Sequence, residues 1–421
     1  MIHRIPTRGW IVVLAGLGIN LALGVLYAWS MVARALTTEW GWSAGQSSLP
    51  YATAVGTFAL SMVFAGRAQD RFGPRIVATI GGLLIGVGLL VASLANANTV
   101  WPMVLGFGLL GGAGIGLGYA STTPAAVKWF PPHRKGLITG IVVSGFGLAS
   151  VYIAPLTSTL ISGSGIASTL RILGVGFLIA VVGLSQLLVN PPAGFVPQTN
   201  TGAVAVKMGP VCRELDWRDM IKTKQFALLW SMYVFATFAG LMIVGHMAKI
   251  AVTQLPSVDL GFGLVAAIGL GNATGRFTAG TAADRFGETK TMFVVFVLQA
   301  IMMGVIGLAH TPLTLVPAAA AIGFLLGSDQ SLFPSATASY FGMKHLGVNF
   351  GLVFTAWGVG GVFGSMTAGM IVDSTGSYSM AYIIAATLSI LAAMMTFATK
   401  APGSISTPIE VDTRSRMARI A

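Results

Sequence analysis

Apolar stretches of about 20 residues recur along the whole chain, and each is long enough to cross a lipid bilayer as a helix. They lie near residues 9–33, 47–67, 76–96, 101–129, 137–163, 170–190, 226–253, 260–283, 291–310, 312–340, 346–373 and 378–400. Only 9% of the 421 residues are charged, whereas roughly a quarter is usual for a soluble domain. The sequence therefore predicts an all-α integral membrane protein with twelve transmembrane helices.

A polar segment at residues 191–225 separates the first six apolar stretches from the last six. It begins with two prolines and is rich in charged residues, so we expect a linker with a short amphipathic piece on the membrane surface. The predicted organisation is an N-terminal six-helix half at 1–190, a cytoplasmic linker at 191–225, a C-terminal six-helix half at 226–400 and a cytoplasmic tail at 401–421.

The distribution of lysine and arginine predicts the orientation in the membrane. Of the 24 basic residues, all but four lie in the termini, the linker and the loops on one side. The four exceptions are Arg34, Arg171, Lys249 and Arg276. By the positive-inside rule, both termini and the linker are cytoplasmic in a multi-pass protein of the inner cell membrane. The net charge of +12 is then explained by orientation and by anionic membrane lipids, so no nucleic-acid partner is expected.

Two sequence patterns occur once in each half. The segment GRAQDRFGPR at 66–75 matches GTAADRFG at 280–287 with an offset of 214 residues. The pair Trp-Phe at 129–130 matches Tyr-Phe at 340–341 with an offset of 211. Two pairs at nearly one offset indicate an internal duplication. Parallel six-helix repeats place a solute site at the middle of the membrane, between the halves.

The repeated loop resembles the signature of the major facilitator superfamily, and both copies stand where that family has them. The resemblance implies two pseudo-symmetric six-helix bundles. Physically, Asp70 can cap a helix end and pair with basic residues across the interface between the halves, so we expect the loop to act as a latch for one conformation. The alternative is that the loops only orient the chain by their charge. The gating-motif residues are Asp70, Arg71, Asp284 and Arg285.

A finer resemblance covers the whole chain. The segment WFPPHRKGLITGIVVSG at 129–145 is similar to the motif that begins the fifth helix in the monocarboxylate transporter and oxalate:formate exchanger families, and residues 8–10 and Arg276 fit the same group. Within it, the sequence looks like a bacterial proton-coupled L-lactate transporter. This implies secondary transport of small monocarboxylates, such as L-lactate and pyruvate-like acids, by proton symport and alternating access. Mammalian members have an acid at the position of Asn272 and a lysine in the first helix, which this chain lacks, so their proton relay does not carry over.

Arg276 is the charged residue that stands out most within an apolar stretch. It lies eight residues before Asp284, so it is about 12 Å from the cytoplasmic end of its helix. An arginine at this depth is costly unless it faces a partner or a cavity. We expect it to clamp a carboxylate, with Asn272 one turn earlier on the same face; the alternative is a structural ion pair. Three aromatic residues are expected to wall the cavity, or else to pack between helices: Tyr27, Tyr119 and Trp357.

Asp329 is the one acid that the apolar stretches place near the core, and His246 lies nearer the outer face. We expect Asp329 to pair with Arg276 and to take up a proton when substrate occupies the arginine; the alternative is a hydrogen bond between helices. His246 can protonate near neutral pH and is a second candidate for proton coupling, although a hydrogen bond to a neighbouring helix would also explain it.

Other functions fit the sequence less well. An oxalate:formate type of anion exchanger has a second cation, a lysine in the eleventh helix, where this chain has Trp357. An enzyme would need a nucleophile with a base or a metal cluster, and neither pattern is found, so no cofactor or metal site is expected. A transporter-like sensor would usually carry a soluble domain, for which the tail at 401–421 is too short. The lone cysteine, Cys212, excludes a disulfide within the chain.

Overall fold

The computed structural model describes residues 7–131, 134–192, 194–195, 214–244, 246–255 and 260–399. Within these residues the protein is helical, apart from turns and one isolated bridge between Asn96 and Thr99. The prediction of an all-α fold is therefore confirmed.

The N-terminal half contains six membrane crossings, and two of them belong to one bent helix. Its elements are α1 (Thr7–Leu23), the 3₁₀ turn η1 (Gly24–Ala28), α2 (Trp29–Glu39), α3 (Ala44–Phe72), α4 (Pro74–Ala92), α5 (Trp101–Met103), the π-helical turn η2 (Val104–Gly111), α6 (Gly112–Val127) and α7 (Lys135–Ser185). At 51 residues, α7 is far longer than one crossing needs. Its chain reverses at Gly165, whose φ of 77° is a left-handed value that glycine adopts readily.

The C-terminal half also contains six crossings. Its elements are α8 (Trp217–Met220), α9 (Lys224–Val244), α10 (Met247–Gln254), α11 (Gly261–Phe286), α12 (Glu288–Gly307), α13 (Pro312–Phe341), α14 (Leu346–Thr375) and α15 (Ser379–Ala398). The predicted stretch 226–253 is not one helix, because α9 ends at Val244 and α10 begins at Met247. Length and hydropathy alone identify ten segments that can span a membrane. The bend in α7 and the 26-residue α11 bring the number of crossings to twelve in the described chain.

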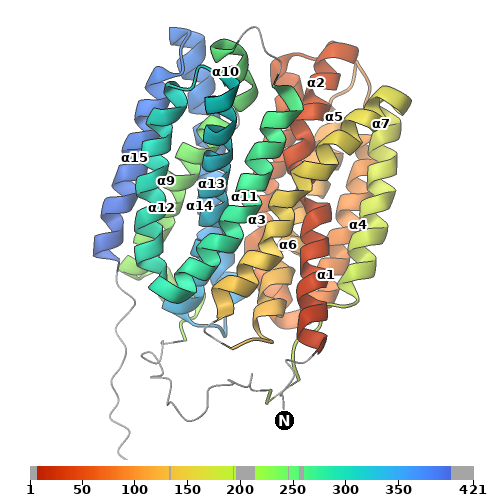
Figure 1. The fold of residues 1–421 in the computed structure, drawn as a ribbon. Coiled ribbons are helices and arrows are strands. Elements are labelled where there is room, and N and C mark those ends of the chain that lie inside the picture. Colours follow the sequence, from red (N-terminus) through yellow and green to blue (C-terminus); the bar gives the residue numbers. More distant parts are fainter. Residues whose placement is uncertain are drawn as a thin grey trace, which may run out of the picture.

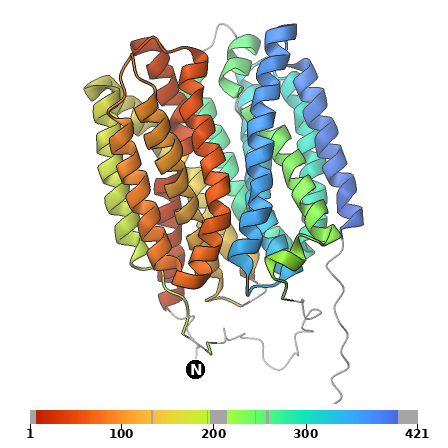
Figure 2. The ribbon, with the colours of Figure 1, turned by 180° about the vertical axis from the view of Figure 1, so that it is seen from behind.

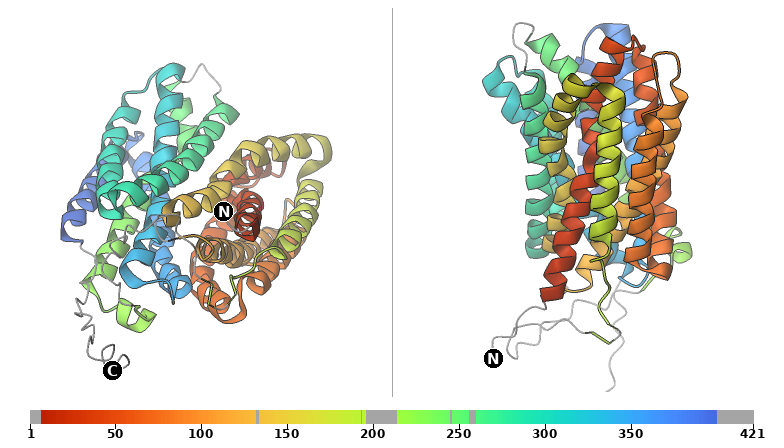
Figure 3. Two further views of the ribbon diagram at one scale, coloured as in Figure 1. Left: turned by 60° about the horizontal axis from the view of Figure 1, so that its bottom comes forward. Right: turned by 90° about the vertical axis from the view of Figure 1, so that its right-hand side faces the viewer.

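The helices form two bundles that lie side by side (Figure 1). In the first bundle α6 packs on α3 and α4, while α7 packs on α1 and α4; in the second, α11 packs on α13, and α15 packs on α9 and α12. The bundles meet along two pairs of helices, α7 with α11 on one face and α3 with α14 on the other (Figures 1 and 2). The view toward the helix ends shows the two groups of helices as separate clusters (Figure 3).

Glycines bring the backbones of the two bundles into contact. A Cβ atom on Gly280 of α11 would overlap the backbone of Gly136 of α7, and one on Gly66 of α3 would overlap Gly347 of α14. Both contacts lie at the end where α3 and α11 finish, the same end at which α1 begins and α15 ends (Figure 1). The bundles are therefore closed against each other at this end, which we call the latch end.

Candidate functional site

Arg276 is buried at the α7–α11 interface, with 1% of its surface exposed. Its Nε donates a 2.9 Å hydrogen bond to Oδ1 of Asn272, and its Nη1 donates to the carbonyl oxygen of Val143 on α7. The guanidinium also lies 5.6 Å from the ring centroid of Phe146, within cation–π range. The two α11 residues are one turn apart, so they share a face as predicted. A Cβ on Gly147 of α7 would lie 2.6 Å from Oδ1 of Asn272, so the absence of a side chain there leaves room for the amide.

The contacts of Arg276 include no carboxylate. Among the described side chains, no carboxylate oxygen lies within 4.0 Å of a guanidinium nitrogen of Arg276. A buried cation without a counter-charge costs several kcal/mol, even when neutral groups hydrogen-bond to it. The predicted pairing of Arg276 with Asp329 is therefore wrong for this structure, and the arginine is free to meet an anion from outside the protein.

A cluster of aromatic side chains from both bundles extends from Phe146, which lies beside the arginine. Phe146 contacts Tyr27 and Tyr119 at centroid distances of 5.6 and 5.4 Å, and Trp357 stacks on Phe354 at 5.2 Å. Phe354 lies 5.9 Å from Tyr119 and so joins the two groups. The structure thus brings together all five residues predicted to contact substrate: Tyr27, Tyr119, Asn272, Arg276 and Trp357.

Two polar groups beside the arginine have no well-aligned hydrogen-bond partner among the described residues. The hydroxyl of Tyr119 lies next to Arg276, but it forms no well-aligned hydrogen bond with the described residues. The Nδ2 of Asn272 is also buried and unpartnered there. Buried groups of this kind are rare in proteins because each costs about 1–3 kcal/mol. Both can therefore serve as donors to a bound molecule.

Asp329 is fully buried in α13, and neither of its carboxyl oxygens has a hydrogen-bond partner among the described residues. It lies within one turn of Leu326 and Phe333, which contact α9. By contrast, Gly327 packs against the backbone of α11. The rotation of α13 thus turns Asp329 toward α9, and this explains why it does not pair with Arg276.

Tyr233 on α9 was not identified from the sequence. It is fully buried, and its hydroxyl donates a 3.2 Å hydrogen bond to Oε1 of Gln330. Its phenol lies within electrostatic reach of Asp329, Arg276 and Tyr119. A tyrosine in an apolar stretch has no distinctive pattern. The internal duplication offered one clue, which concerns Gln330, the partner of Tyr233. Gln330 lies 211 residues after Tyr119, so the two residues occupy equivalent positions in the two halves.

His246 lies away from this site. It precedes α10, and its Nδ1 is 3.3 Å from the hydroxyl of Tyr378 just before α15. Its ring is 3.9 Å from the place where Gly369 would carry a Cβ. Gly369 lies more than three turns beyond Trp357 along α14, or about 18 Å. The structure therefore does not bring His246 together with Arg276.

At the latch end, an acid from each bundle caps a helix of the other bundle. Oδ1 and Oδ2 of Asp284 accept hydrogen bonds of 2.9 Å each from the backbone N–H groups of Gly136 and Leu137 at the start of α7. The carboxylate of Asp70, at the end of α3, faces the start of α14: one oxygen lies 3.1 Å from the place where Gly347 would carry a Cβ, and the backbone N–H of Val348 is near enough to stabilise its charge. A carboxylate at a helix N-terminus satisfies free N–H groups and interacts favourably with the helix dipole.

The arginines of the repeated loops do not take part in these caps. Arg71 lies over the ring of Phe72 at 5.2 Å, and Arg285 lies over Phe286 at 5.4 Å, each exposed beside its neighbour in the sequence. The described hydrogen bonds of Asp284 across the interface go to backbone groups of α7, and Asp70 lies within electrostatic reach of His345 in the other bundle.

Comparisons with known proteins agree with this architecture. The chain matches the family model described as Major Facilitator Superfamily over residues 10–271 and 248–417. It is 27% identical to the oxalate:formate antiporter of Oxalobacter formigenes over 409 residues, covering 93% of this chain and 91% of that protein. It is 25% identical to monocarboxylate transporter 13 of Rattus norvegicus over 407 residues, covering 91% and 88%. Among solved structures, the proton:xylose symporter XylE matches with a TM-score of 0.73 and 14% identity over 94% of this chain and 96% of that one, which shows a shared fold.

Proposed function

The chain belongs to the major facilitator superfamily, and from that premise we propose that it is a secondary active transporter of small monocarboxylates, moving L-lactate or a pyruvate-like acid together with a proton. Two relatives support the substrate class, since one is an oxalate:formate antiporter and the other a monocarboxylate transporter. The observation that carries the proposal is the burial of Arg276 between the bundles with no described carboxylate beside it.

In this proposal the substrate carboxylate supplies the missing negative charge. Arginine has five N–H donors, and Asn272 and Val143 engage two of them, which leaves others for an anion. The hydroxyl of Tyr119 and the Nδ2 of Asn272 complete the polar contacts. The cluster of aromatic side chains, which includes Trp357, encloses the short apolar tail of the substrate. It provides no second cation for a dicarboxylate.

We assign proton coupling to Asp329. An ionised carboxylate with no partner in a low-dielectric interior is costly, so the buried acid is a suitable place for the transported proton. Substrate on Arg276 and a proton on Asp329 give a loaded protein without uncompensated buried charge, which can pass through an occluded state. Tyr233 lies within electrostatic reach of both Asp329 and Arg276, so it can link protonation of the acid to binding of the substrate.

We further propose that the latch end faces the cytoplasm of a cell with this protein in its inner membrane, with both termini and the linker on that side. The bias of lysine and arginine supports this orientation. The caps made by Asp70 and Asp284 then close the cytoplasmic side, and their release opens it during alternating access.

Uptake of labelled L-lactate into proteoliposomes tests the proposal. With acid outside, lactate should accumulate above its external concentration, and a protonophore should abolish the accumulation. Anion exchange of the oxalate:formate type predicts a different result, namely uptake that requires an anion inside the vesicles and ignores the pH gradient. That second result would replace proton symport with exchange, and no lactate movement in either format would refute the substrate class.

A further inference from the structure

The C-terminal end of the linker is fastened to the turn between α13 and α14. Oε2 of Glu214 accepts a 2.9 Å hydrogen bond from the backbone N–H of Lys344, and Oε1 accepts a 3.3 Å bond from that of Met343. The turn presents these amides because α13 ends at Gly342, whose φ of 88° is a left-handed value. A Cβ on Gly342 would overlap Oε2 of Glu214, so the glycine also makes room for the carboxylate.

The next residue of the linker binds on both sides of the same turn. The backbone N–H of Leu215 donates a 3.1 Å hydrogen bond to the carbonyl of Phe341, the last residue of α13. The carbonyl of Leu215 accepts a 3.0 Å bond from Nδ2 of Asn349, which is fully buried in the first turn of α14. The linker end, the end of α13 and the start of α14 therefore form one hydrogen-bonded unit.

This unit contains the groups that the latch requires. Lys344 is three residues before Gly347, which packs on Gly66 and beside the carboxylate of Asp70 in the other bundle, and four before Val348, whose N–H faces the same carboxylate. From this geometry we propose that Glu214 is a positioning residue for the latch. Its carboxylate fixes the turn so that the start of α14 meets Asp70, and losing it weakens closure of the latch end. The inference rests on the proposed role of the latch but not on the identity of the substrate.

The other half has an equivalent attachment. Nε1 of Trp129 donates a 2.8 Å hydrogen bond to the carbonyl of Val189, and the ring of Phe195 contacts Trp129 at 5.3 Å. Trp129 lies in the turn before α7, and the start of α7 is capped by Asp284. Each described end of the linker is thus bound to a turn that leads into a capped helix, one before α7 and the other before α14. The linker therefore contacts both halves of the latch end.

Hydrogen exchange of the protein in lipid nanodiscs, without substrate, tests the proposal. Glu214→Gln keeps the size of the side chain but loses its charge, so one backbone N–H is left poorly paired. We expect exchange to rise about tenfold at the amides of 346–348 and also at those of Gly136 and Leu137, which lie in the other cap. Because the remote amides do not contact Glu214, their response reports opening of the whole latch end.

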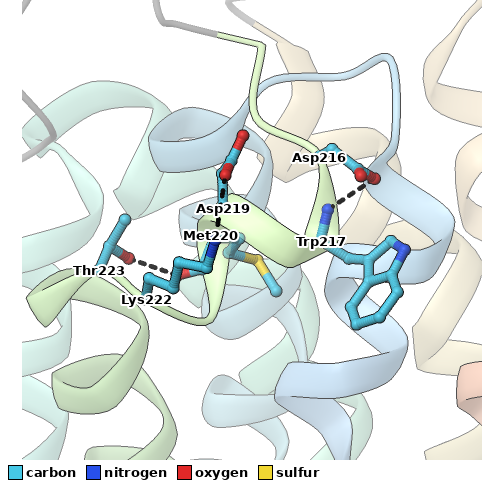
Figure 4. A network of polar contacts seen from close by, with 6 residues as sticks. All are labelled: Asp216, Trp217, Asp219, Met220, Lys222 and Thr223. Atoms are coloured by element: carbon cyan, nitrogen blue, oxygen red, sulfur yellow. Dashed lines mark hydrogen bonds and ion pairs between the residues drawn. The ribbon is translucent and has the colours of Figure 1, made fainter.

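The matched control is Asp219→Asn, which changes another exposed acid in the same segment (Figure 4). Its carboxylate lies 3.7 Å from Nζ of the exposed Lys222 and forms no other ion pair within the described part of the chain, so exchange at both caps should stay unchanged. Gly342→Ala, which pushes a methyl group into the carboxylate, should reproduce the effect of Glu214→Gln. Faster exchange confined to residues 343–344, or equal effects of the control, would overturn the proposal whether or not the protein transports lactate.

Discussion

Replacing Arg276 with lysine separates the charge of the site from its geometry. Lysine keeps the positive charge, but it lacks the planar fork that now donates to Asn272 and Val143 while leaving other N–H groups for an anion. At least one hydrogen bond to the substrate carboxylate is lost, and a charge-assisted bond is worth about 1.5–3 kcal/mol. The dissociation constant for lactate should therefore rise roughly 10- to 150-fold.

Binding of lactate to purified protein by calorimetry measures this change, and thermal unfolding in detergent checks that the variant is folded. Arg171→Lys is the matched control, because Arg171 is an exposed arginine whose Nε donates a 3.3 Å hydrogen bond to the hydroxyl of Ser93. It should bind lactate as the unchanged protein does. If a folded Arg276→Lys protein binds lactate within twofold of normal, Arg276 does not grip the carboxylate and the substrate site lies elsewhere.

Three further predictions follow from the same geometry. Asp329→Asn should keep lactate counterflow but lose accumulation driven by a pH gradient, both measured in the same proteoliposomes; accumulation that persists would make Asp329 structural. Trp357→Lys places a second cation in the cluster of aromatic side chains, so it should weaken lactate transport. Oxalate should then compete several-fold better against labelled lactate uptake, and unchanged competition would contradict this. Gly280→Val places a side chain against the backbone of Gly136, so the latch end cannot close and uptake should fall below a tenth of normal, with faster hydrogen exchange at Gly136; normal uptake would show that this contact is not needed.

The positions of the helices along the chain were largely predictable, because hydropathy alone indicates most of the membrane-spanning segments. The twelve predicted stretches overlap the helices of the two bundles, and the charged loops mark the latch end. The break between Val244 and Met247 was missed, since apolar sequence continues through it. The contacts between α7 and α11 were also invisible to hydropathy, because they depend on which glycines face each other.

Members of the candidate site could be proposed from the sequence only where a residue differs sharply from its apolar surroundings. Arg276 and Asn272 stand out for this reason, and their spacing places them on one face of a helix. Asp329 stands out equally, yet its partner was predicted wrongly, since depth in the membrane does not reveal the rotation of α13 about its axis. Tyr233 gave no signal at all, because an aromatic residue in an apolar helix usually packs between neighbours.

The separation of Arg276 from Asp329 changes how coupling has to work. If the two charges formed one ion pair, an arriving carboxylate would displace Asp329 from the arginine and so force its protonation directly. With Asp329 turned toward α9, substrate can act on it only through the field across the interior and through Tyr233, which lies within reach of both. In a low-dielectric interior such a field is strong without contact. On the proposed scheme, loss of Arg276 should therefore remove binding, whereas loss of Asp329 should remove coupling and leave binding intact. Were the two residues a single ion pair, either substitution would leave an unpaired buried charge and damage both properties.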